Sequence, residues 1–113
     1  MGDGRRVACI FRSTRTIDAG DEYDAWSLRI DELVTSTPGY LSHVNFRDSS
    51  SRDGVTLSYF DSLEAVALWR EEPIHRLAQA LGRERFYEEY TIEIVEVVRD
   101  YRWSKGDEFT HGL

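Results

Sequence analysis

The stretch that decides the fold is Asp53–Tyr90, DGVTLSYFDSLEAVALWREEPIHRLAQALGRERFYEEY. It begins with the run Val55–Phe60, whose large or β-branched side chains at successive positions are typical of a strand covered on both faces. Asp61 or Ser62 can then cap a helix, and Glu64 follows Asp61 at the spacing of a capping box. The stretch therefore predicts a strand that turns directly into a helix.

The expected helix carries one apolar stripe that continues through a proline. Pro73 cannot donate a hydrogen bond to the carbonyl of Trp69, so we expect the helix to kink or restart at Glu72–Pro73. Gly82 is expected to end it. The stripe consists of Val66, Trp69, Pro73, Ile74, Leu77, Ala78 and Leu81.

The break at Pro73 predicts a gap beside Trp69. The side chains expected near the gap have large flat surfaces and mostly polar tips: Trp69, His75, Phe86, Tyr87 and Tyr90. This composition suits an aromatic or polyketide-like small molecule. It is also the composition of an ordinary core, and both interpretations stay open at this point.

Composition excludes several classes of protein. With 113 residues the chain forms one domain, and 14 basic against 21 acidic residues give a net charge of −7, which disfavours nucleic acid. Its single cysteine, Cys9, is expected to be a small buried apolar residue. We expect no metal, because His43, His75 and His111 lack ligand spacing, and no membrane span, so we predict a soluble cytoplasmic protein.

Upstream of this stretch the pattern predicts a strand over Val7–Thr14 and a helix that begins near Asp21 and ends before Pro38-Gly39. Three acidic residues of the helix, Asp24, Asp31 and Glu32, lie off its apolar stripe. The stripe consists of Tyr23, Trp26, Ile30, Leu33, Val34 and Thr37.

A second strand is predicted over Tyr40–Arg47, and a polar turn then leads into the strand at Val55–Phe60 as an antiparallel hairpin. Simple alternation places Tyr40, Val44 and Phe46 on one face. The other face carries Leu41, His43, Asn45 and Arg47. This second face is either solvated or lines the polar end of a cavity.

The run Thr91–Trp103, TIEIVEVVRDYRW, predicts a last strand that is several residues longer than the others, and residues 104–113 form a polar tail. The order βαββαβ predicts an α+β, ferredoxin-like fold, with a four-stranded antiparallel sheet and both helices on one face. The other face would expose a large apolar patch in a monomer, so we expect a homodimer in which two sheets face each other.

Over residues 5–103 the chain resembles the antibiotic biosynthesis monooxygenase family, whose domains form a dimeric α+β barrel. The resemblance rests on Pro38-Gly39-Tyr40, VTLSYF, Trp69, His75, Gly82-Arg83 and VVRDYRW. The family contains cofactor-free oxygenases, haem-degrading enzymes and isomerase-like members. The resemblance therefore implies the fold more strongly than one chemistry.

Two departures from the family concern the candidate site. Anthrone-oxidising members have an asparagine four residues before the shared tryptophan and a tyrosine six residues after it, and here these positions are Ala65 and His75. Haem-degrading members need an axial histidine about ten residues after the tryptophan, where this chain has Gln79. Haem breakdown is therefore disfavoured, whereas histidine can still serve as a base.

The resemblance implies a cofactor-independent monooxygenase that uses O2 on a small aromatic molecule in secondary metabolism, with its pocket between the second helix and the sheet. His75 is the expected base and Trp69 a wall, while Asn45 or Arg47 meets the developing oxyanion. The alternative is a non-catalytic module that binds a small molecule, and a haem protein is disfavoured. The other expected substrate contacts are Tyr59, His43, Phe86, Tyr87 and Tyr90.

Overall fold

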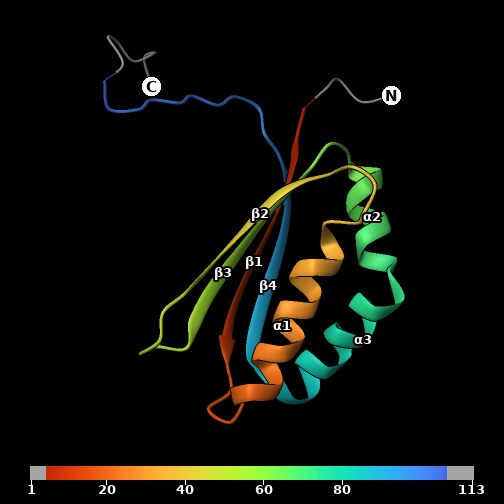
Figure 1. Ribbon diagram of the computed structural model, residues 1–113, viewed down its shortest axis with the longest axis vertical. Coiled ribbons are helices and arrows are strands. Elements are labelled where there is room, and N and C mark those ends of the chain that lie inside the picture. The colour runs from red at the N-terminus through yellow and green to blue at the C-terminus, as the bar shows by residue number, and fades with distance from the viewer. Residues whose placement is uncertain (1–4, 107–113) are drawn as a thin grey trace.

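A computed structural model describes residues 5–106 and confirms the ferredoxin-like arrangement. The strands form one antiparallel sheet in the order β2-β3-β1-β4, and the helices cover one of its faces (Figure 1). The elements are β1 (Val7–Arg15), α1 (Gly20–Val34), β2 (Tyr40–Arg47), β3 (Asp53–Phe60), α2 (Leu63–Glu71), α3 (Pro73–Leu81), the π-helical turn η1 (Gly82–Phe86) and β4 (Tyr87–Glu96).

The core lies between α1, α2 and β3. Phe60 of β3 is completely buried, and it packs with Val34 of α1 and with Ala65 and Trp69 of α2. Cys9 of β1 lies against this cluster, and burial raises the pKa of its thiol, as expected for a cysteine that serves as a small apolar residue.

The two faces of the sheet follow from the position of Phe60 and from the strand register. The helix face carries Cys9, Tyr40, His43, Asn45, Arg47, Ser58 and Phe60. The open face carries Ile10, Val44, Phe46, Val55, Leu57, Tyr59 and Val95. The described residues place no helix on the open face (Figure 1).

The break in the second helix is confirmed at Glu72–Pro73. Ser62 rather than Asp61 caps α2, because its hydroxyl accepts a hydrogen bond from the amide of Ala65 at 3.1 Å. Glu72 then leaves the helical conformation, and its carboxylate accepts from the amide of His75 at 2.8 Å. Pro73 is the first residue of α3, where its missing amide hydrogen leaves no hydrogen bond unmade.

α3 ends at Leu81 and Gly82 follows it, as predicted, but Gly82 does not adopt the left-handed conformation of a helix-ending glycine. Its φ of −58° is right-handed, and the chain continues through η1 to Phe86. The absent side chain serves a close approach instead, since a Cβ on Gly82 would lie 2.8 Å from the ring of Tyr87. Gly82 thus allows the start of β4 to fold back against the helical segment.

The bounds of the last strand also differ from the prediction. β4 begins at Tyr87 and ends at Glu96, and its length of 10 residues exceeds the 9 of β1 by one. Its partner β1 begins at Val7, which pairs with Glu96, so residues 97–103 have no strand beside them. They continue as an extended segment that leaves the sheet (Figure 1). Of the expected tail, 104–106 are exposed, and 107–113, His111 included, lie outside the described residues.

A β-bulge in β2 changes the predicted faces of this strand. Tyr40 pairs with Phe60, whereas Ser42 pairs with Tyr59, so one extra residue is inserted at Leu41. Simple alternation had predicted that Tyr40 shares a face with Val44. In the structure Tyr40 lies on the helix face, together with His43. α1 also ends four residues before Pro38, at Val34, and a short turn completes the connection.

Replacing Gly39 by alanine is expected to lower the free energy of unfolding by about 2–4 kcal/mol. Gly39 has a φ of +89°, and an added Cβ would lie 2.6 Å from the Cβ of Ala65. Chemical denaturation measures the loss. Gly20 is the matched control, because its φ is also positive but nothing lies within 4 Å of an added Cβ. Gly20→Ala should therefore cost only about 1 kcal/mol, and an equal loss in both variants would contradict the packing argument.

Candidate functional site

The broken helix brings His75 onto Trp69. The imidazole stacks on the indole with ring centroids 3.8 Å apart and an interplanar angle of 11°. In one continuous helix, six residues would rotate His75 about 240° from Trp69. The restart at Pro73 removes that rotation, so the two residues named as base and wall do lie together.

Hydrogen bonding and burial leave one nitrogen of His75 available as a base. The Nδ1 atom lies 2.9 Å from the carbonyl oxygen of Trp69, which can only accept, so Nδ1 carries the hydrogen. Burial lowers the pKa of His75 below its ordinary value of 6.5, although the Trp69 carbonyl and Glu72 oppose this shift. The imidazole is therefore neutral near pH 7, with the lone pair on Nε2.

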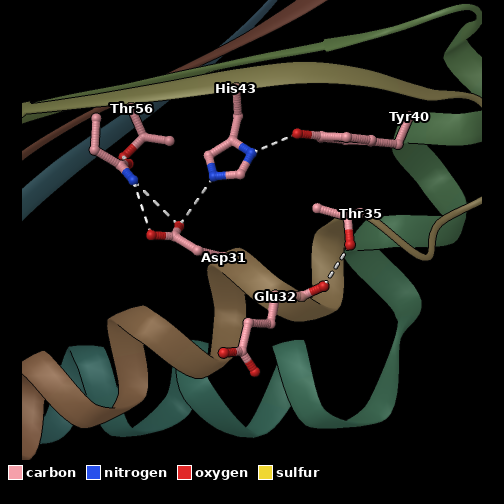
Figure 2. Close-up of polar contacts among 7 residues, drawn as sticks. Asp31, Glu32, Thr35, Tyr40, His43 and Thr56 are labelled. Atoms are coloured by element: carbon pink, nitrogen blue, oxygen red, sulfur yellow. Dashed lines mark hydrogen bonds and ion pairs between the residues drawn. The ribbon is translucent and has the colours of Figure 1, made fainter.

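Five side chains from α1, β2 and β3 form a second group, which we call the polar cluster: Asp31, Tyr40, His43, Asn45 and Thr56. Figure 2 shows Asp31 reaching from α1 toward the sheet, 3.4 Å from the Nε2 atom of His43. The Nδ1 atom of His43 lies 2.7 Å from the hydroxyl of Tyr40 (Figure 2). The amide of Asn45 donates to Asp31 at 3.0 and 3.2 Å and accepts from the hydroxyl of Thr56.

Asp31 is the residue of this cluster that sequence reasoning missed. It lies off the apolar stripe of α1, and that position predicts a solvated carboxylate. In the structure it faces β2, because the side chains of β2 beneath α1 are polar. The sequence did contain a signal, because His43 and Asn45 are two residues apart and so share one face of the strand. A polar strand face beneath a helix needs a polar partner. The polar face of β2 thus meets α1; it is not simply solvated.

Arg47 is held by neutral partners at the other end of the sheet. Its guanidinium donates to the Ser13 hydroxyl at 3.0 Å, to the Tyr23 hydroxyl at 3.1 Å and to the Arg52 carbonyl at 2.8 Å. It also lies 5.3 Å from the centre of the Tyr23 ring, which Arg15 approaches at 4.8 Å. These contacts fix the β2–β3 hairpin to β1 and α1.

Three aromatic residues named as substrate contacts form a third group together with Tyr23 and Phe11. Phe86 and Tyr87 lie edge-on to Tyr23 at 5.8 and 5.9 Å, and Tyr87 and Tyr90 both contact Phe11. Burial is the largest cause that raises the pKa of Tyr87, so its hydroxyl stays protonated at neutral pH. The structure thus brings Phe86, Tyr87 and Tyr90 together: Phe86 and Tyr87 lie against Tyr23, and Tyr90 lies against Tyr87 and Phe11.

The register separates these groups along the sheet. Arg47 pairs with Gly54, whereas Trp69 packs on Phe60, six residues further along β3. At about 3.3 Å per residue these positions lie roughly 20 Å apart, so one small molecule cannot touch both. Tyr59 lies on the open face, under the guanidinium of Arg6, and cannot line a pocket with Trp69.

An open depression of about 800 Å³ lies near the β2–β3 turn and away from His75. Its lining comes mainly from the sheet and includes Arg12, Thr14, Phe46, Asp53, Val55 and Thr91. The described residues contain no group of three or more His, Cys, Asp or Glu side chains placed to hold a metal ion. Every helix of the described part is too short or too polar to cross a bilayer.

Proteins similar to this chain are known both by sequence and by structure. No protein-family model matches it. It is 34% identical over 93 residues to YqjZ, an uncharacterised protein of Bacillus subtilis (strain 168), and the match covers 81% of this chain and 79% of YqjZ. The structure of Rv0793 from Mycobacterium tuberculosis is similar with a TM-score of 0.75 and 17% identity, over 84% of this chain and 97% of that one.

Two further structures carry informative names. A putative antibiotic biosynthesis monooxygenase from Nitrosomonas europaea has a TM-score of 0.74 and 11% identity, over 87% of this chain and 95% of its own. A variant of SnoaB, a cofactor-independent oxygenase from Streptomyces nogalater, has a TM-score of 0.72 and 14% identity, over 84% and 95%. The chain therefore belongs to the same family as YqjZ of Bacillus subtilis, and its fold is that of the antibiotic biosynthesis monooxygenases.

Proposed function

We propose that this protein is a cofactor-independent monooxygenase that acts on an aromatic or polyketide-like small molecule in secondary metabolism. The single observation that carries the proposal is the stacked pair of His75 and Trp69 at the helix break. It holds a neutral imidazole in an apolar, aromatic environment, and a neutral base is what an acidic aromatic substrate requires. The named oxygenase SnoaB, with the same fold, supports the reaction class.

The reaction needs from the protein a base, a surface and exclusion of water. Nε2 of His75 takes a proton from a ring CH2 group beside a carbonyl or phenol, and the resulting carbanion transfers one electron to O2. The two radicals combine to a carbon-bound peroxide, which regains the proton and loses water. The CH2 group and O2 thus become a carbonyl group and H2O, without an external reductant.

We assign no role in oxyanion binding to Asn45 or Arg47. Asn45 is bonded to Asp31 and Thr56, and Arg47 is bonded to Ser13 and Tyr23 at the far end of the sheet. The catalytic assignment therefore rests on His75 and Trp69, with Trp69 as a wall.

Replacing His75 by alanine is expected to lower the rate of oxygen uptake on an anthrone or quinol substrate by about 10²–10⁴-fold, the usual contribution of a general base. An oxygen electrode measures it. Arg76→Ala is the matched control, because Arg76 is the next residue of α3 and its side chain is 67% exposed. Oxygen uptake that survives in His75→Ala would remove His75 from the mechanism.

The pH profile of kcat/KM is expected to lose activity on the acid side only below pH 6.5. The base is active when neutral, and burial lowers the pKa of His75 below the ordinary value of 6.5. The profile in His75→Gln, with any residual rate, should lack this acid limb. An acid limb above 6.5 in the unaltered protein would contradict the assignment of His75 as the base.

The second candidate function is a non-catalytic module that binds a small molecule. It is favoured by the burial of Trp69, which is only 7% exposed, and by the position of the open depression away from His75. A protein of this kind would raise its melting temperature with a quinol or anthrone and consume no O2. A haem titration tests the less favoured third function, since a Soret band that is lost in His75→Ala would establish haem binding.

We further propose that the protein is a homodimer through its open face. Val44, Phe46 and Val95 are exposed there by 39%, 59% and 38%, and the extended segment after β4 exposes Val98 and Trp103. Apolar area of this kind is normally covered. A second copy of the same sheet is a covering of the right shape, because a two-fold axis pairs each patch with itself.

A further inference from the structure

The contacts of the polar cluster converge on the carboxylate of Asp31 from two sides. Thr56 donates to Asn45, Asn45 donates to both carboxylate oxygens of Asp31, and Asp31 lies beside His43, which bonds Tyr40 (Figure 2). Asp31 is thereby fixed in position from the side of the sheet.

These contacts determine which nitrogen of His43 carries the hydrogen. A carboxylate only accepts, so a neutral His43 ring can serve both neighbours only with its hydrogen on Nε2, the atom that lies 3.4 Å from Asp31. Nδ1 then accepts from the hydroxyl of Tyr40 at 2.7 Å. The order of carboxylate, imidazole and hydroxyl is that of a hydrolase triad, but here a phenol replaces the serine hydroxyl, the two ring nitrogens are exchanged, and the carboxylate contact is an ion-pair distance of 3.4 Å.

The cluster is also partly exposed. β2 is an edge strand, and α1 covers it from one side only. The side chains of Asp31 and His43 are 34% and 16% exposed, so the cluster is partly shielded from water without being sealed. Tyr40 also packs against the core cluster of Phe60 and Trp69, which gives the site an apolar wall.

We propose that Asp31, His43 and Tyr40 form a second proton-accepting site, separate from His75, for the hydroxyl group of a hydroxyaromatic ligand. The ligand O–H gives its proton to the Tyr40 oxygen while Tyr40 passes its own proton to Nδ1 of His43. The products are a bound phenolate, a neutral Tyr40 and an imidazolium that forms an ion pair with Asp31. Protons and charge balance, and neither O2 nor His75 takes part.

The test uses umbelliferone, a fluorescent phenol whose neutral and anionic forms differ in excitation. At a pH about one unit below its own pKa, binding to the intact protein should raise the ratio of phenolate to phenol at least about tenfold. Asp31→Asn and His43→Gln should still bind the probe but return this ratio to that of the free dye. Asp31→Asn keeps the size of the side chain and one acceptor oxygen, and it removes the negative charge that would pair with the imidazolium.

His75→Ala is the control that separates the two sites, and it should retain the full shift because His75 does not contact the cluster. Tyr40→Phe should lose the shift, and circular dichroism should show each variant folded. The proposal is overturned if umbelliferone does not bind, if its ionisation does not change on binding, or if Asp31→Asn keeps the shift. Loss of the shift in His75→Ala overturns it too. Failure of the oxygenase proposal leaves this result unaffected, because the assay contains no oxidation step.

Discussion

Replacing Leu57 by lysine is expected to convert the protein from a dimer to a monomer. Leu57 lies at the middle of the open face, where it pairs with Ile10 on one side and Val44 on the other. Even about 600 Å² of apolar area covered per subunit, at about 25 cal/mol per Å², contributes roughly 15 kcal/mol from each partner before the cost of association. We therefore expect a stable dimer at micromolar concentration.

The interface would contain two of these lysines, because the two-fold axis places residue 57 of both subunits in it. One buried, unpaired charge costs about 3–5 kcal/mol, so the dissociation constant should rise at least about 1000-fold. In the monomer the same side chain reaches water, and the fold should survive. Sedimentation velocity should find twice 13.1 kDa for the unaltered protein and 13.1 kDa for Leu57→Lys.

The matched control is Leu28→Lys, since Leu28 lies on α1 and is 63% exposed. It should remain dimeric. A second arm tests the extended segment, whose Val97 amide bonds the Arg6 carbonyl while Trp103 is 53% exposed. A chain that ends at Val98 should dissociate more readily than a chain that ends at Trp103. A folded, monomeric unaltered protein at micromolar concentration would contradict the dimer proposal.

Features with a local cause could be predicted from the sequence. The break between α2 and α3 is set by Pro73, whose ring and missing amide hydrogen act within one turn of the helix. The strand over Tyr40–Arg47 is bounded by Pro38-Gly39 before it and by a polar turn after it, so its residues were predicted as the structure has them. The order of elements then fixed the sheet topology.

Features that depend on a distant partner could not be predicted. β4 ends at Glu96 because β1 begins at Val7, although the β-forming pattern continues to Trp103. The bulge at Leu41 reverses the face of Tyr40, and no residue type announces it. Gly82 follows the end of α3 as predicted, but the sequence does not reveal that its missing side chain makes room for the ring of Tyr87.

The candidate site also contains residues that could be placed from the sequence and residues that could not. His75 and Trp69 were placed together correctly because one local event, the restart at Pro73, controls their relation. Arg47 was grouped with them by its chemistry, but strand register places it about 20 Å away. Asp31 was missed because the partner that turns it inward, the polar face of β2, is brought to it only by tertiary packing.

Replacing Trp69 by alanine is expected to have two effects, and both follow from the loss of the indole ring. The indole is 7% exposed and belongs to the core cluster, so its loss should lower the free energy of unfolding by about 3–5 kcal/mol. It is also the surface on which His75 stacks, and burial is the largest cause of the lowered pKa of His75. The pKa of His75 should therefore rise toward 6.5, as measured by NMR titration of the imidazole.

Phe60→Ala is the control for the loss of core packing alone, since Phe60 is completely buried in the same cluster but forms no ring stack with His75. It should cost a similar free energy and leave the pKa of His75 low. In the unaltered protein, stability should fall as the pH drops below 6.5, because the unfolded chain takes up a proton at His75 that the folded protein refuses. Trp69→Ala should weaken this pH dependence of stability, and Phe60→Ala should keep it. An unchanged pKa of His75 in Trp69→Ala would show that the stacked indole is not what keeps the base neutral.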